Sequence, residues 1–244
     1  MAPRFLTKPL RLPRLKPYVP EPDDPAIFWF NSERDDIVRE VVRRLGERYA
    51  ADRRTLEYAL NEVAFYEVQR LEGQRDDEAK ESIGYWKGLL RRVAKMSDDA
   101  KRDALRGISE RMARDIAGNF DPRVYKFASH VTPRLLTGVM KPGALPRDLA
   151  SVGLGAPALD ELLTIEGDTE LLKRLEKKGT LVYVPTHGSN LDSIAFGYAL
   201  MRSGLAPVVY GAGKNLFTNP IISFFMHNLG AYRVDRRVRA RLYK

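Results

Sequence analysis

The chain has 244 residues, of which 44% are hydrophobic and 30% charged, and its formal net charge is +9. The apolar content excludes a wholly disordered chain, and the length suffices for one domain or two small ones with a buried core. The chain contains no cysteine, which excludes a disulfide framework, a thiolate zinc site and a cysteine nucleophile.

The positive charge is concentrated at the two ends of the chain. Residues 1–20 carry five basic residues and no acid, and residues 233–244 carry six basic residues and one acid. The rest holds 30 basic and 31 acidic residues, a net charge of −1. Such ends suit phosphate-bearing partners, namely lipid headgroups, nucleic acid or a phosphorylated substrate. Basic ends that are merely solvated are the alternative.

The sequence predicts neither a transmembrane helix nor a secretory signal. No stretch of 18 apolar residues occurs, and five prolines interrupt the basic residues 1–20. With only three histidines, a multi-histidine metal site is not expected. We expect a cytoplasmic protein that is peripheral to the inner face of the membrane.

The first half of the chain predicts an arm followed by a helical module. Residues 1–31 form a basic, proline-rich arm, whose aromatic residues 28–30 are expected to pack on the body. From 32 to 118, apolar residues recur at spacings of three and four, as on one face of each of about four helices. Turn or capping signals separate these helices at 72–74, 97–98 and 118–119.

The second half predicts linkers and then an α/β layer. Residues 119–155 contain four prolines and are interpreted as linkers with short helices. In residues 156–244 we expect strands at 181–185, 207–210 and 231–234, with helices at 159–178, 191–202 and 221–229. This order is typical of a parallel sheet. The predicted fold class is therefore α/β, with a helical N-terminal module followed by the first part of an α/β domain.

The most informative stretch follows the expected strand at 181–185. His187 lies in a loop at the carboxyl end of that strand, where α/β proteins usually bind ligands, and Asp192 comes five residues later in the next helix. A carboxylate fixes the tautomer of a histidine and raises its basicity. Gly188 permits the tight bend that brings the two side chains together, and Asn190 is a candidate helix cap. A purely structural pair of a loop histidine and a capping aspartate is the alternative.

Two further segments extend this pattern. Residues 184–192 resemble the first motif of the glycerolipid acyltransferases, a family with a His-x4-Asp motif. Residues 230–236 resemble the family's Gly-x-x-x-hydrophobic-Asp/Arg-Arg block. Between them, residues 213–216 resemble the Gly-x-Asn-Leu segment of the glycerol-3-phosphate acyltransferase branch. The resemblance covers residues 181–238, and the long helical extension before it also favours that branch.

The resemblance implies a mechanism and a set of site residues. His187 would act as a general base on a glycerol hydroxyl, oriented by Asp192, and the hydroxyl would attack the thioester of acyl-CoA or acyl carrier protein. Arg236 would bind the substrate phosphate, with Ser189 and Lys214 as further substrate-binding residues. For Ser189, the alternative is a structural role in closing the loop. For Lys214, the alternative is a solvated loop lysine.

The resemblance also sets the expected substrates and partners. No bound cofactor is expected, and the donor would be acyl-CoA or acyl carrier protein. The acceptor would be glycerol-3-phosphate, or alternatively lysophosphatidate. The other partner would be an anionic membrane surface and not nucleic acid. A non-catalytic module that binds anionic lipid is the alternative of another class.

The sequence departs from the family pattern in two ways. The later blocks of the family do not occur before Lys244, so we expect this chain to be the N-terminal part of a longer acyltransferase or a natural truncation. In the second block, Arg233 occupies a position that is usually apolar or aromatic in the family.

Overall fold

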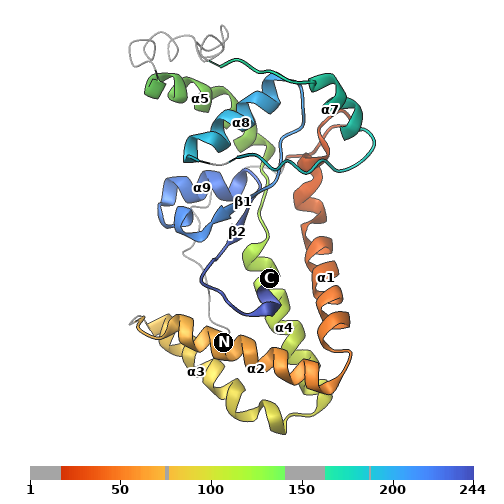
Figure 1. The fold of residues 1–244 in the computed structure, drawn as a ribbon, viewed down its shortest axis with the longest axis vertical. Coiled ribbons are helices and arrows are strands. Elements are labelled where there is room, and N and C mark those ends of the chain that lie inside the picture. The colour runs from red at the N-terminus through yellow and green to blue at the C-terminus, as the bar shows by residue number, and fades with distance from the viewer. Residues whose placement is uncertain (1–17, 75–76, 141–162, 187) are drawn as a thin grey trace. The chain divides into compact units, whose positions relative to one another are not determined.

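The computed structural model describes residues 18–74, 77–140, 163–186 and 188–244 (Figure 1). Contacts divide these residues into two compact units. The first unit comprises Phe30–Asn119 together with Tyr210–Lys244, and the second comprises residues 18–29, 120–140 and 163–209 with the same gap at 187. Residues 210–244, which belong to the predicted α/β part, thus share a unit with the predicted helical module.

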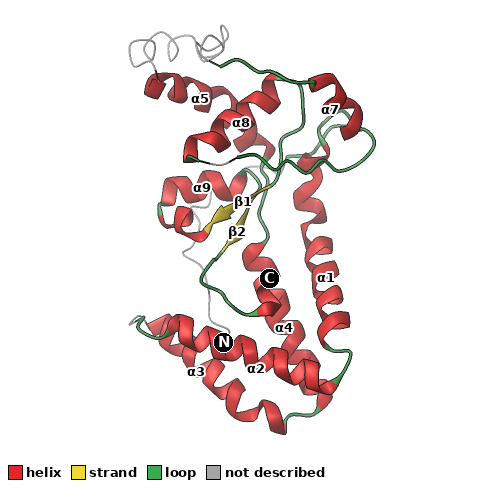
Figure 2. Cartoon of the chain, viewed as in Figure 1, coloured by secondary structure: helices red, strands yellow, loops and turns green. Residues whose placement is uncertain are grey.

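The helical part of the first unit has four long helices, α1 (Phe30–Tyr49), α2 (Arg53–Leu71), α3 (Asp77–Arg92) and α4 (Asp98–Ile116), with a short 3-10 turn η2 (Val93–Lys95). The predicted four-helix pattern is confirmed. Asp52 caps α2 by accepting from the Thr55 N–H, and Ser97 caps α4 by accepting from the Ala100 N–H. Helices α2 and α3 lie side by side (Figures 1 and 2).

The core of this unit lies between α2, α3, α4 and the end of the chain. The side chains of Leu60, Trp86 and Leu105 are almost completely buried. Val238, Ala240 and Leu242, which flank or belong to the 3-10 turn η6 (Arg241–Tyr243), pack into the same cluster. The segment after the second sequence block is therefore part of the helical core.

The sheet consists of two short parallel strands in the first unit (Figure 2). Strand β1 (Tyr210–Gly213) is followed by the 3-10 helix η5 (Lys214–Thr218), helix α9 (Pro220–Asn228) and strand β2 (Ala231–Val234). The parallel pairing, α9 and β2 are as the sequence predicts. The strand predicted at 207–210 is displaced, because the chain pairs with β2 from Tyr210 through two glycines. A Cβ at Gly211 would lie 2.9 Å from the Tyr232 hydroxyl, so a larger residue here would displace the exposed Tyr232 ring.

The prediction of a strand at 181–185 is wrong. Residues 181–186 have no regular secondary structure, and the side chains of Val182 and Val184 are 83% and 90% exposed. Within the described ranges the sheet contains β1 and β2 only. A run of β-branched residues favours a strand but forms one only where a partner strand satisfies its backbone groups.

The second unit contains the turn η1 (Ala26–Trp29) and the helices α5 (Pro122–Met140), α7 (Thr169–Glu176) and α8 (Asn190–Arg202). Phe28 is buried against Phe120 and Tyr125, as expected for the aromatic end of the arm. Of residues 119–155, interpreted as linkers with short helices, residues 122–140 form one longer helix, α5, which accommodates Pro133, and residues 141–155 lie outside the described ranges.

Two details concern α5 and the helix that follows it. In α5, the Arg134 side chain donates to the carbonyl of His130, one turn earlier in the same helix. The helix predicted at 159–178 is shorter, since α7 begins only after its cap Asp168; residues 159–162 lie outside the described ranges. No helix in the described parts of the chain is both long and apolar enough to cross a membrane.

Candidate active site

The loop before α8 is closed by Asp192. Its Oδ2 atom accepts hydrogen bonds from the backbone N–H groups of Gly188 and Ser189, both at 2.7 Å, and its own N–H donates to the Ser189 carbonyl at 3.1 Å. Helix α8 begins at Asn190, so Ser189 occupies the cap position and Asp192 reaches back to it from the first turn, as in a capping box. The cap is thus one residue earlier than the expected Asn190.

The chain therefore bends so that the Asp192 carboxylate lies against the backbone of the loop before α8. The Asp192 carboxylate contacts the amide of the residue that directly follows His187. His187 itself lies outside the described residues, and its pairing with Asp192 stays a prediction. Ser189 and Asp192 belong to the second unit, whereas Lys214 and Arg236 belong to the first.

The block at 230–236 forms a turn and a strand in the first unit. Gly230 has a φ of +83°, a left-handed conformation that favours glycine, and it leads directly into β2. Arg233 points inward: its side chain is largely buried, pairs with Asp115 of α4 at 3.1 Å and lies over the Phe217 ring at 4.9 Å. Arg236 is exposed, consistent with access to a ligand.

Asp235 organises the turn after β2. Its carboxylate accepts hydrogen bonds from the Arg237 backbone N–H at 3.0 Å and from the Arg237 side chain, and it lies 3.6 Å from Lys214 Nζ. Burial acts to raise the pKa of Asp235, but the hydrogen bonds from Arg237 and the charge of Lys214 outweigh it, so the pKa lies below its usual value. Asp235 is therefore a carboxylate at neutral pH, and Lys214 lies against that carboxylate.

A small cavity lies inside the first unit, beside this turn. Its volume is about 40 Å³, and its lining includes Trp86, Asp115, Lys214 and Asp235. Ligand pockets for molecules of drug size measure about 300–1,000 Å³. The cavity is thus too small for a ligand of that size.

The loop closed by Asp192 and the turn around Asp235 both lie in the part of the chain that is similar to a known family. Residues 166–244 match the family model described as Acyltransferase. The match covers about a third of the chain and includes all five predicted site residues. It supports an acyltransferase domain in this part of the chain and a general acyltransferase role. No curated protein and no solved structure matches the chain.

Sequence reasoning missed Asp115, which lies more than a hundred residues before the block that it contacts. It also missed the buried pair of Glu67 and Arg70 in α2, whose side chains meet at 2.6 Å. The one available signal was the unusual Arg233, because a buried arginine requires a carboxylate partner. The sequence alone does not identify which of the acidic residues supplies it.

Proposed function

We propose that the protein is an O-acyltransferase that moves a fatty acyl group from acyl-CoA or acyl carrier protein to glycerol-3-phosphate in phospholipid synthesis. The observation that carries the proposal is the match of residues 166–244 to the Acyltransferase family model. That range includes both the His187-x4-Asp192 segment and the block at 230–236, which are the segments that resemble the glycerolipid branch.

In the proposed reaction, His187 takes the proton from a glycerol hydroxyl. The hydroxyl oxygen then attacks the thioester carbonyl carbon, the carbon–sulfur bond breaks, and the histidine returns the proton to the departing thiolate. Asp192 orients His187 and stabilises its protonated form. The two backbone hydrogen bonds that Asp192 accepts support this role, since they hold the carboxylate beside the residue following His187. The substrate supplies the nucleophile, so the absence of cysteine from the sequence presents no obstacle.

The proposed acceptor site uses Arg236 for the phosphate. A guanidinium is permanently charged and matches phosphate geometry, and Arg236 is exposed. Lys214 and Ser189 are proposed as further contributors. For Lys214, the role is electrostatic, because its ammonium group already lies near Asp235.

The proposal is tested by acyl transfer from a labelled thioester to glycerol-3-phosphate, using wild type, His187→Ala and Asp192→Asn. We expect His187→Ala to lose about 10²–10⁴-fold in turnover, the usual contribution of a general base. Ser193→Ala is the matched control, since Ser193 is exposed in the same turn of α8. Turnover that survives His187→Ala would contradict the mechanism.

The same assay, run also with lysophosphatidate as acceptor, distinguishes the proposed function from its two alternatives, a lysophosphatidate acyltransferase and a non-catalytic lipid-binding module. Transfer to lysophosphatidate but not to glycerol-3-phosphate would replace the proposed acceptor and leave the mechanism unchanged. A protein that binds anionic lipid but transfers no acyl group would support the non-catalytic module. One observation favours lipid contact in either case: Ile221 and Ile222 of α9 are 67% and 42% exposed. We therefore also propose that the protein works at the cytoplasmic face of the membrane.

A further inference from the structure

The second sequence block is attached to the carboxyl end of α4 through its backbone. The Asn119 N–H donates to the His227 carbonyl at 3.2 Å, and the Gly230 N–H donates to the Asn119 carbonyl at 2.9 Å. At Gly118, a Cβ would lie only 2.8 Å from the Ala231 carbonyl oxygen. The start of β2 is therefore in close contact with the chain that leaves α4.

The side chains strengthen this attachment through one buried ion pair. Asp115, in the last turn of α4, pairs with Arg233 of β2, whose side chain is only 9% exposed. Removing one partner of a buried pair is costly because the other charge remains uncompensated. Arg34 of α1 also donates to the Ala117 and Gly118 carbonyls, which anchors the same end of α4.

The other side of the block is anchored as well. The Asp235 N–H donates to the Tyr243 hydroxyl at 3.0 Å, and Val238, Ala240 and Leu242 are buried in the helical core. Arg236 thus lies in a short exposed turn between two segments that the helical module holds. Its backbone position depends on helices that precede it in sequence by more than a hundred residues.

We infer that the helical module positions the acceptor-binding turn, and that Asp115 is a positioning residue that acts through Arg233 on Arg236. This inference rests on the proposed function, in which Arg236 binds the acceptor phosphate. A charged side chain binds a phosphate well only when its supporting residues hold it in place. The inference assigns a role to the helices and explains why an arginine occupies a position that is usually apolar in the family that the block resembles.

The test compares Asp115→Asn with a matched control that breaks a different ion pair of α4. Glu57→Gln breaks the ion pair with the fully buried Lys101 of α4, 2.7 Å away, fourteen residues or about 21 Å along the helix from Asp115. We expect Asp115→Asn to raise the KM for glycerol-3-phosphate about tenfold, equal to about 1.4 kcal/mol, with kcat changed less than about twofold. Glu57→Gln should lower thermal stability without changing this KM. Arg236→Ala removes the proposed phosphate contact itself, so its KM for glycerol-3-phosphate gives the largest increase expected.

Two rescue variants and one direct measurement complete the design. Asp115→Glu keeps the charge and should restore most of the KM, and the double variant Asp115→Asn/Arg233→Met should be milder than Asp115→Asn alone, because no buried charge remains unpaired. Hydrogen exchange of the amides at 231–237 should be faster in Asp115→Asn and unchanged in Glu57→Gln.

The outcomes separate this inference from the proposed function. A KM that is unchanged in Asp115→Asn overturns the inference, whether or not exchange at 231–237 is faster. If the wild type transfers no acyl group, the proposed function fails, and calorimetric binding of glycerol-3-phosphate decides the inference instead. Weaker binding by Asp115→Asn but not by Glu57→Gln supports it, and equal binding or no binding by the wild type overturns it.

Discussion

His227 of α9 is a titratable residue that lies close to the charged cluster of the first unit. Burial lowers its pKa to about 4, and the charges of Arg233 and Arg34 act in the same direction. An unfolded histidine has a pKa of about 6.5. The folded state therefore holds His227 neutral across a pH range in which the unfolded state binds a proton.

This difference predicts a loss of stability in mild acid. Between pH 6.5 and pH 4 the unfolded state binds more protons, so the free energy of unfolding falls as the pH is lowered. We expect His227 to contribute about 1–2 kcal/mol to this fall, less than the full shift because the ring is partly exposed to solvent. Urea unfolding of wild type and His227→Gln at pH 7 and pH 4.5 measures it.

The variant His227→Gln should show the weaker pH dependence, because glutamine does not titrate. His130→Gln is the control, since His130 is exposed on α5. Equal pH dependence in His227→Gln and wild type would show that other groups cause the acid sensitivity.

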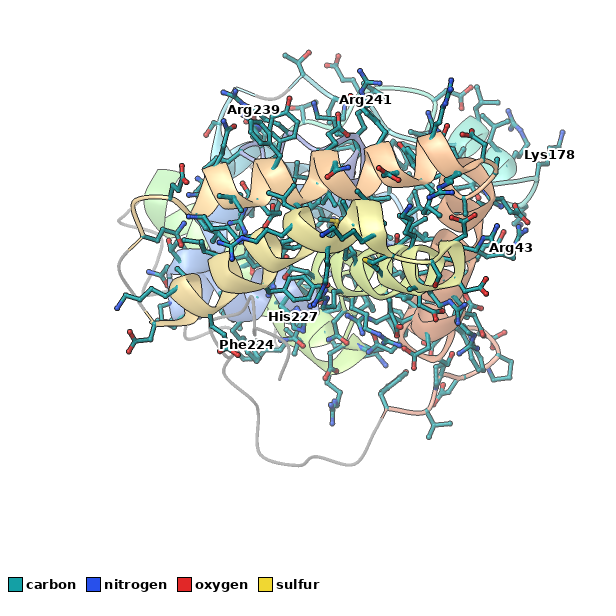
Figure 3. All side chains as sticks on the ribbon, turned by 90° about the horizontal axis from the view of Figure 1, so that it is seen from below. Arg43, Lys178, Phe224, His227, Arg239 and Arg241 are labelled. Atoms are coloured by element: carbon teal, nitrogen blue, oxygen red, sulfur yellow. The ribbon has the colours of Figure 1, made fainter. Side chains whose placement is uncertain are left out.

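At the scale of elements, the terminal segment binds the helices through both its backbone and its side chains. Arg241 lies alongside α2 (Figure 3), where its N–H donates to Glu62 at 3.0 Å and its guanidinium lies over the Tyr58 ring. Leu242 is 4% exposed and belongs to the same core cluster as Leu60 and Trp86. The short turn η6 thus closes the core of α2, α3 and α4.

We predict that Leu242→Ala lowers the free energy of unfolding by about 2–4 kcal/mol, through lost apolar burial and the cavity that it leaves. Val184→Ala, at a position that is 90% exposed, should change it by less than about 0.5 kcal/mol. Denaturant unfolding measures both values. If the two variants are equally stable, the terminal segment contributes little to the core.

For the whole molecule, the sign and placement of charge lead to a prediction about the proposed binding to a membrane. The net charge is +9, and three exposed arginines, Arg236, Arg237 and Arg239, follow β2. Attraction of a basic residue to an anionic surface contributes about 1 kcal/mol at physiological salt. Salt screens this attraction with a Debye length of about 8 Å at 0.15 M.

We therefore expect the protein to bind phosphatidylserine vesicles and to dissociate as salt increases. Replacing Arg236, Arg237 and Arg239 by alanine should weaken binding by about 100-fold, and phosphatidylcholine vesicles should bind weakly throughout. The charge-matched control replaces Arg39, Arg43 and Arg44 of α1, each of which pairs with a carboxylate of its own helix. Equal weakening by the two triple variants would show that only net charge matters.

The helices were predictable because their signals are local. The caps Asp52 and Ser97 and the left-handed Gly73 act within a few residues, and apolar spacing identifies the face that each helix buries. The turn at Gly230 and the strand that follows it were predictable for the same reason. The loop closed by Asp192 was predictable in outline, since five residues of chain keep the carboxylate near residue 187.

The tertiary structure alone decided which strands form and what the buried charges contact. Among the described residues, the apolar segment 181–185 has no strand partner, whereas the glycine-containing segment at 210–213 forms β1 because β2 lies beside it. Likewise, the pairing of Arg233 with Asp115 joins residues 118 positions apart. Sequence patterns report what each residue favours locally, but hydrogen bonds between strands and ion pairs between distant elements depend on which segments the folded chain brings together.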